Sequence, residues 1–184
     1  MTAALVSPPA ALPVTLEQLR DHLRIIENDE DAYLVDLLRA ATAHSENRSG
    51  RKFVTQVWRR YAGGLRAGGA VSLNLGPVRR IEAVTLYDAN GVPTQASPGD
   101  WRLVDEVLIL DHLVPGAAAN GVEIDVVCGY GDVAPDVPDA LRRAILMLAA
   151  HWHEFRGAVA PKDQPVSVPP GFDTLVRPYR GVRL

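Results

Sequence analysis

The chain has 184 residues, of which 47% are hydrophobic and 22% are charged, with a formal net charge of −3 and one cysteine. This length suits one ordinary domain that buries about 70% of its unfolded surface, and it needs no disulfide or metal to fold. A single cysteine excludes an internal disulfide framework and a cysteine-rich zinc site, and it favours a reducing compartment. The slight acidic excess argues against a duplex-DNA-binding domain, which would carry a dominant basic patch.

Residues 1–14 are rich in Ala and Pro and show no hydrophobic periodicity, so we expect an extended N-terminal lead, with order beginning at Thr15. This segment has no basic residue before its apolar residues and is interrupted by prolines, which does not fit a signal peptide. No apolar run approaches the roughly 20 residues of a membrane helix. The sequence therefore predicts a soluble, cytosolic chain.

Two helices are predicted in the N-terminal quarter, over residues 15–24 and 29–50. In the first, Thr15 and Gln18 have the spacing of a capping box, and Leu19 belongs to its apolar stripe. The second follows an acidic cluster, Glu27-Asn28-Asp29-Glu30-Asp31, whose negative charge suits a helix N-terminus. Gly50 is its expected C-terminal cap.

From Arg51 the hydrophobic period changes from helical to alternating, which predicts a mostly antiparallel β region over residues 53–128. Asn90-Gly91 suits a tight hairpin turn because both residues tolerate positive φ angles. In the last strand, alternation places Cys128 on the buried face. About six short strands are expected, in the ranges 53–61, 71–75, 81–87, 101–104, 107–110 and 122–126.

A third, strongly apolar helix is predicted over residues 139–156, after Pro138. Residues 158–184 are punctuated by prolines and lack periodicity, so we expect an extended C-terminal tail without a core of its own. Prolines lower the entropy that such a segment loses when it lies along another protein. A disordered tail without function is the alternative.

Residues with catalytic or metal-binding potential have simpler explanations. Cys128 is expected to be a small buried hydrophobe rather than a nucleophile. His151 and His153 are two residues apart on a helix and point in different directions, so they do not suit one metal ion. Gly129-Tyr130-Gly131 lacks the rest of a phosphate-loop motif and favours a sharp turn. We predict no catalytic, cofactor-binding or metal-binding residues, and no enzyme activity.

The charges alternate along the chain. Residues 1–50 and 101–150 carry more acidic than basic side chains, whereas residues 51–100 and 151–184 carry more basic ones. Such blocks suggest polar faces that meet complementary faces of neighbours, although chance fluctuation explains them equally well. Arginine makes up 17 of the 19 basic residues, a bias that either phosphate recognition or a GC-rich genome explains.

The order of these elements resembles the phage head-tail connector (adaptor) family, over roughly residues 13–157. The motifs that carry the resemblance are short but follow the order of the family. They are Pro13 to Arg24, Asn28 to Asp31, Ser49-Gly50-Arg51, Val54 to Trp58, Pro77-Val78, Val84 to Gly91, Gly129-Tyr130-Gly131, and Pro138 with Leu146 to Glu154.

The resemblance implies an α+β fold: a helical bundle of two N-terminal helices and one long C-terminal helix, with an antiparallel β region between them and an extended C-terminal tail. It implies one connector domain over residues 15–157, between the lead 1–14 and the tail 158–184. The longer β region and the proline-punctuated tail of this chain depart from the simplest members.

The resemblance also implies a function as a structural virion protein of long-tailed phages, prophages or gene transfer agents. Such subunits form a ring, typically of twelve, beneath the portal, extend the DNA channel and provide the attachment site for the tail. The implied partners are the ring neighbours, the portal and the next connector (stopper) or tail-terminator protein, with DNA passing through the lumen without sequence-specific binding and no membrane involved. The implied location is the virion neck, and the host bacterial cytoplasm before assembly.

The resemblance and the tail together give a hypothesis about partner binding. We expect the tail to order when it docks on the portal or on a neighbouring subunit, through Arg177, Tyr179, Arg180 and Arg183. Free subunits are expected to stay monomeric until the portal is present. The alternative function is a small cytosolic enzyme or ligand-binding domain with a site assembled from scattered residues.

Overall fold

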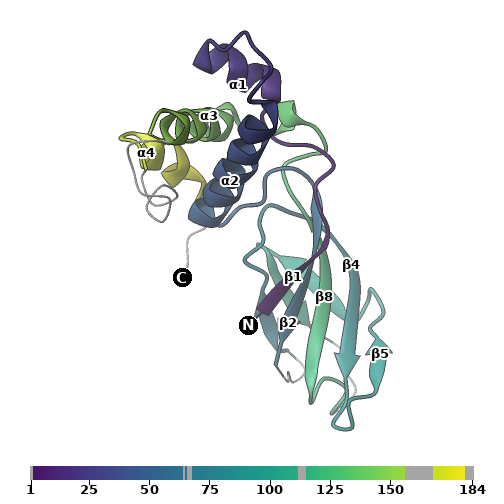
Figure 1. Cartoon of the computed structure of the whole chain (residues 1–184). Coiled ribbons are helices and arrows are strands. Elements are labelled where there is room, and N and C mark those ends of the chain that lie inside the picture. The colour runs from purple at the N-terminus through teal and green to yellow at the C-terminus, as the bar shows by residue number, and fades with distance from the viewer. Residues whose placement is uncertain (1, 64, 66–67, 112–114, 156–167, 181–184) are drawn as a thin grey trace. The chain divides into compact units, whose positions relative to one another are not determined.

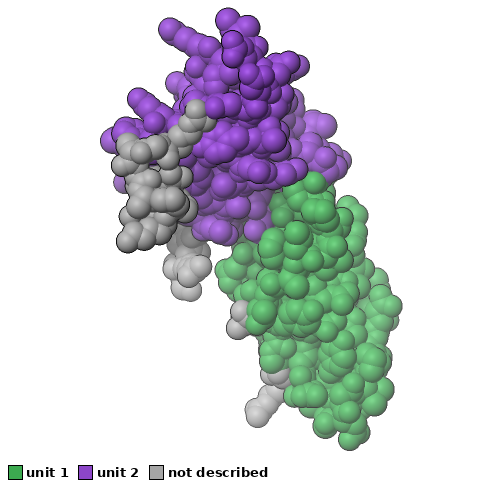
Figure 2. All heavy atoms as spheres, viewed as in Figure 1, with its two compact units in different colours: residues 1–9, 55–129 green, residues 10–54, 130–184 purple. Residues whose placement is uncertain are grey.

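The structure, a computed structural model, describes residues 2–63, 65, 68–111, 115–155 and 168–180. The chain divides into two compact units, shown in green and purple in Figure 2. Residues 1–9 and 55–129 form the β unit, and residues 10–54 and 130–184 form the helical unit. The chain is therefore α+β, with its strands antiparallel wherever two described strands pair, and with four α-helices among the described residues.

The β unit contains two antiparallel sheets (Figure 1). The larger has the strand order β1-β2-β8-β4-β5, with β1 Thr2–Ser7, β2 Gln56–Ala62, β8 Gly121–Cys128, β4 Val78–Tyr87 and β5 Pro93–Gln95. The smaller has the order β3-β7-β6, with β3 Ala70–Ser72, β7 Val107–Leu110 and β6 Trp101–Val104.

The alternating pattern of β8 positions the core of this unit. Ile124, Val126 and Cys128 are fully buried on one face of the strand, which confirms the expected inward position of Cys128. They belong to one apolar cluster with Leu108 and Leu110 of β7, so the two sheets pack their inner faces together. Glu123 and Asp125, which alternate with them, lie half-buried on the opposite face of the larger sheet, whereas Val127 on that face is buried.

Two tight turns set the register of neighbouring strands. Asn90-Gly91 lies in a turn after β4 as predicted, but of the pair only Gly91 adopts a positive φ, 78°. The Gly91 N–H donates to the Asp88 carbonyl over 2.9 Å. The β6–β7 hairpin turns at Asp105 and Glu106, with φ angles of 46° and 65°. Neither is glycine, so this second turn places two side chains in the left-handed region.

The sequence prediction that order begins at Thr15 is wrong, although the N-terminal segment is extended as expected. Order begins well before Thr15, because Thr2–Ser7 form β1 and pair antiparallel with β2. The sequence shows no alternation there because no side chain of β1 is buried, so nothing selects for one apolar face. The short β5 was also not expected, and the described strands number eight rather than six.

The helical unit contains α1 Leu16–Leu23, α2 Asp31–Ser49, α3 Asp139–Glu154 and the short α4 Phe172–Val176. The predicted capping box is present at α1: the Gln18 N–H donates to the Thr15 hydroxyl over 3.2 Å, and the Thr15 N–H donates to Gln18 Oε1 over 3.0 Å. Gly50 caps α2 with a φ of 70°, as predicted. Glu30 precedes α2 without a capping bond from its side chain.

The helices share one apolar core. α2 packs against α3, α1 contacts both of them, and α4 contacts α3 and α2. Leu38 of α2 and Leu148 of α3 are fully buried in this cluster, and burying a leucine side chain contributes about 1.5–3 kcal/mol. Among the described helices, none is both long and apolar enough to cross a membrane.

Candidate functional site

The C-terminal segment that the sequence assigns to an extended tail is partly folded. α4 is followed by a 3-10 turn, η3, over Arg177–Tyr179. Phe172 and Val176 are completely buried in the core of the helical unit, and Tyr179 packs against the same core. α4, drawn in yellow, lies beside α3 in Figure 1. The prediction of a tail that stays extended until it docks is therefore wrong for residues 172–179.

An ion-pair network ties α4 to the C-terminal end of α2. Arg48 donates from Nε and Nη2 to the two carboxylate oxygens of Asp173, both over 2.9 Å. Arg180 donates from Nη2 to Asp173 Oδ1 over 2.9 Å and from Nε to the Arg48 carbonyl over 3.2 Å. The hydrogen bond from Arg48 holds the pKa of Asp173 below its usual value and raises the pKa of Arg48 itself.

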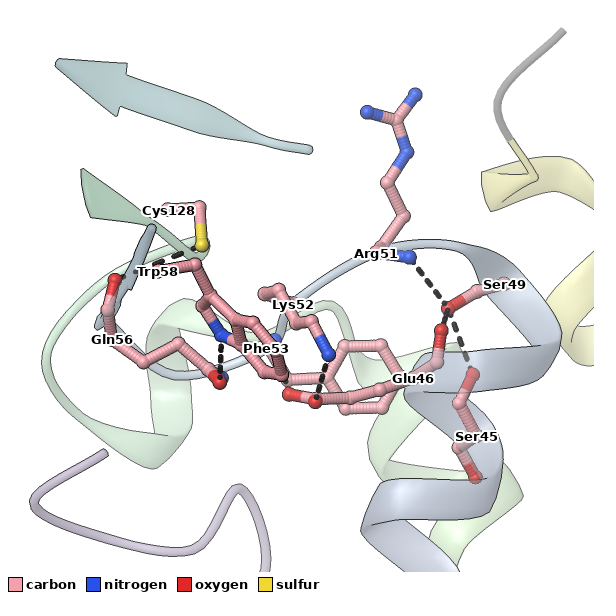
Figure 3. A network of polar contacts seen from close by, with 9 residues as sticks. All are labelled: Ser45, Glu46, Ser49, Arg51, Lys52, Phe53, Gln56, Trp58 and Cys128. Carbon is pink, nitrogen blue, oxygen red and sulfur yellow. Dashed lines mark hydrogen bonds and ion pairs between the residues drawn. The ribbon is translucent and has the colours of Figure 1, made fainter. Parts of the chain in front are cut away.

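The segment that leaves α2 is also fixed by polar contacts, shown in Figure 3. Glu46 accepts the Phe53 N–H over 2.9 Å and pairs with Lys52 Nζ over 3.2 Å. Ser49 accepts the Arg51 N–H over 3.2 Å. Arg51 in turn donates from Nε to the Tyr179 carbonyl over 3.0 Å, and this hydrogen bond joins the segment to η3.

These contacts hold Arg48, Arg51 and Arg180 around η3, and Arg177 belongs to the same 3-10 turn. We call these four arginines the basic surface. Arg48 and Arg180 share the carboxylate of Asp173, whereas Arg51 donates to the Tyr179 carbonyl. Arg177 is exposed, whereas Arg180 is half-buried against Asp173. The surface is suited to bind carboxylates or other oxyanions, because a guanidinium donates in a fork.

The sequence prediction names three residues that the structure places at this surface. Arg177, Tyr179 and Arg180 all lie in or beside η3. The fourth, Arg183, lies outside the described residues. Sequence reasoning missed Arg48 and Arg51; the only available signal was their spacing of three residues at the predicted end of the second helix.

A second polar surface lies on the outer face of the larger sheet in the β unit. Arg59 of β2 donates from Nε and Nη2 to Asp125 of β8 over 2.7 and 2.8 Å, and its Nη1 lies 3.5 Å from Glu123. A hydrogen bond with Glu123 raises the pKa of Tyr87. These two strand carboxylates therefore bind one arginine across the sheet. Ion pairs between neighbouring strands stabilise the sheet and its register. They do not by themselves provide a reactive group.

Among the described residues, the thiol and the two histidines considered as reactive groups each have a different neighbour. The Cys128 thiol donates weakly to the Gln56 carbonyl over 3.7 Å. His153 Nε2 lies 3.2 Å from Glu30, whereas the His151 ring lies 4.8 Å from the Phe155 ring. Within the part of the chain that the structure describes, no three His, Cys, Asp or Glu side chains gather in a way that could hold a metal ion.

An open groove of about 610 Å³ lies between α1 and α3 of the helical unit. Asp139 and Arg142 form an ion pair at its wall, and burial followed by the charge of Arg143 lowers the pKa of His22. The lining mixes both signs of charge with two apolar side chains: Val14, Gln18, Asp21, His22, Asp139, Arg142, Arg143 and Leu146. This composition fits a polar contact surface better than an enclosed small-molecule site.

Comparison with known proteins gives the class to which this fold belongs. The model of the phage gp6-like head-tail connector protein family matches residues 13–92. A chain in the neck of an empty gene transfer agent particle, computed with C6 symmetry, is 30% identical with a TM-score of 0.81, and the match covers 100% of this chain and 97% of that one. No curated protein matches.

Two further solved structures agree. A chain in the virion of the native gene transfer agent particle is 28% identical with a TM-score of 0.81, and one in the native neck computed with C12 symmetry is 30% identical with a TM-score of 0.78. Both matches cover 100% of this chain and 97% of the other. The chain belongs to the phage gp6-like head-tail connector family, which confirms the resemblance seen in the sequence.

Proposed function

We propose that this protein is a structural subunit of a virion neck, in which copies form a ring beneath the portal, extend the DNA channel and provide the attachment site for the tail. The observation that carries this proposal is the match over the whole chain, at 30% identity, to a chain in the neck of a gene transfer agent particle. Membership of a structural family also supports a role without catalysis.

A ring of identical subunits needs two different, complementary surfaces on each subunit. The relatives come from necks computed with C6 and C12 symmetry, which supports an oligomeric ring, and we propose twelve copies. DNA has to slide through such a ring without being held. A net charge of −3 suits this task, because strong basic contacts would bind phosphate.

We further propose that the four helices act as one bundle that carries the contact with the portal. The connector function would then include α4 and η3 in addition to residues 15–157, the connector domain expected from the sequence. Other partners would be the ring neighbours and the next connector or tail-terminator protein. Subunits would wait as monomers in the host cytoplasm and reach the neck when the portal is present.

The basic surface is our candidate for the portal contact. Its ion pairs with Asp173 prearrange Arg48 and Arg180, so docking would cost less side-chain entropy than it would for an unfolded tail. Arg177 is exposed beside them and available to a carboxylate on the partner. The partner surface would therefore be acidic.

Attachment to portal-bearing heads tests both parts of this proposal. Tailless heads would be mixed with the wild-type chain, with Arg177→Glu, or with the control Arg39→Glu, and bound subunits would be measured after sedimentation. Arg39 is an exposed arginine of α2 that pairs only locally with Asp36 among the described residues, so its reversal makes the same charge change elsewhere. We expect the wild-type chain and Arg39→Glu to attach and Arg177→Glu to lose attachment.

The outcomes separate the two parts. Failure of the wild-type chain to attach to heads that lack it would contradict the connector function. Normal attachment of Arg177→Glu, with the wild-type chain attached, would refute the role of the basic surface alone.

A further inference from the structure

The two edges of the larger sheet differ in how they are protected. One edge is β5, which has three residues and begins with Pro93, so it offers few main-chain groups for pairing. The other edge is β1, whose six residues, Thr2–Ser7, include no charged residue and no proline. Natural proteins blunt exposed strand edges with charges, prolines, short strands or bulges, and of these β1 has only a register shift near its end.

The outer edge of β1 is open. β1 pairs with β2 on one side, and no other described strand pairs with it, so the main-chain groups of its second edge are left without a strand partner in the part of the chain that the structure describes. A register shift between Leu5 and Ser7 interrupts the ladder near the end of the strand. Such an edge is a template on which an added strand can form main-chain hydrogen bonds.

The side chains of β1 are also uncovered. None is buried, and Leu5 and Val6 are 47% and 52% exposed. The strand therefore gains little from side-chain burial in the single chain, and main-chain pairing with β2 is what holds it. A partner strand on the open edge would supply both further main-chain bonds and apolar contacts for these two residues.

We propose that the open edge of β1 pairs with a strand of a second copy of this chain, the neighbouring subunit of the ring. This inference rests on the proposed ring function. A contact between neighbours in a ring joins two different surfaces of the subunit. The open edge of β1 can be one of these surfaces, because the other edge of the same sheet is the short β5. An open edge that recruited copies without closure would build filaments, whereas a closed ring uses the edge of every subunit and leaves none exposed.

A pair of matched variants tests the proposal. Leu5→Lys with Val6→Lys places two charges on the open edge, and Val92→Lys places a charge on a 55% exposed valine at the turn before β5. Both should leave the thermal unfolding of the free chain unchanged, since all three residues are exposed. The β1 variant should reduce the number of copies per neck about tenfold, because charged edge strands resist pairing, and Val92→Lys should not.

The identity of the occupant is tested by a photo-reactive amino acid at position 5, activated in assembled particles. Crosslinking to a second copy of this chain supports the proposal. Crosslinking only to another neck protein, or full assembly of the β1 lysine variant, would overturn it. If the wild-type chain itself were missing from necks, the proposed function would fail instead, so the two failures are distinguishable.

Discussion

Replacing Phe172 by alanine should strongly destabilise the helical unit, although this residue lies in a segment whose sequence suggests a docking tail. The side chain is completely buried, and its ring centroid lies 5.6 Å from that of His44. Truncation of a buried phenylalanine to alanine costs about 3–5 kcal/mol, because transfer free energy is lost and a cavity remains. α4 has five residues, too few to persist without this contact.

Urea unfolding, followed by helical circular dichroism, measures this loss directly. Val168→Ala is the matched control, because Val168 is an exposed apolar residue of the same segment, and it should change the free energy of unfolding by less than about 0.5 kcal/mol. A loss below about 1 kcal/mol for Phe172→Ala would show that α4 contributes little to the folded unit. The argument that the C-terminal segment belongs to the core would then be refuted.

Three smaller predictions follow from local geometry. Thr15→Ala removes the capping box and should lower the free energy of unfolding by about 1 kcal/mol in urea titrations. Glu106→Gly relieves a positive φ in the β6–β7 turn and should raise the midpoint of thermal unfolding, by an amount that corresponds to about 0.5–1 kcal/mol. Burial, followed by the charge of Arg48, lowers the pKa of His44. The neutral His44 ring therefore contributes stability above pH 6.5, and this contribution is lost as the pH falls through the lowered pKa. With His44→Phe, the free energy of unfolding should therefore fall less steeply below pH 6.5 than in the wild-type chain. An equally steep fall in both chains would contradict this role of His44.

Elements with a strong local signal could be predicted from the sequence. The Thr15 capping box, the Gly50 cap and the Asn90-Gly91 turn each depend on the conformational preference of one or two residues, and all three are present. The inward position of Cys128 followed from strand alternation, because the sheet it belongs to has one buried face.

Elements that depend on distant contacts could not be predicted. β1 has no apolar periodicity because its side chains stay uncovered, and its strand conformation comes from pairing with β2, far along the chain. α4 is too short for a helical period to be visible, and Phe172 is ordered by a core built from the other helices.

The basic surface could be predicted only in part, because some of its residues meet only in the folded chain. Arg177 and Arg180 stood out as neighbouring cations in the sequence, whereas Arg48 and Asp173 are 125 residues apart and meet only in the folded chain. The resemblance to the connector family identified the function class without locating the contact residues. The geometry adds that Arg180 is engaged within the unit and that Arg177 is exposed.

The most direct test of the connector function is deletion of this gene in the strain that produces the particles, followed by electron microscopy of those particles. The proposed function predicts DNA-filled heads and separate tails, restored to joined particles when the wild-type gene is supplied again. Normal tailed particles from the deletion strain would show that the protein is not needed to join head and tail, and would contradict the central claim.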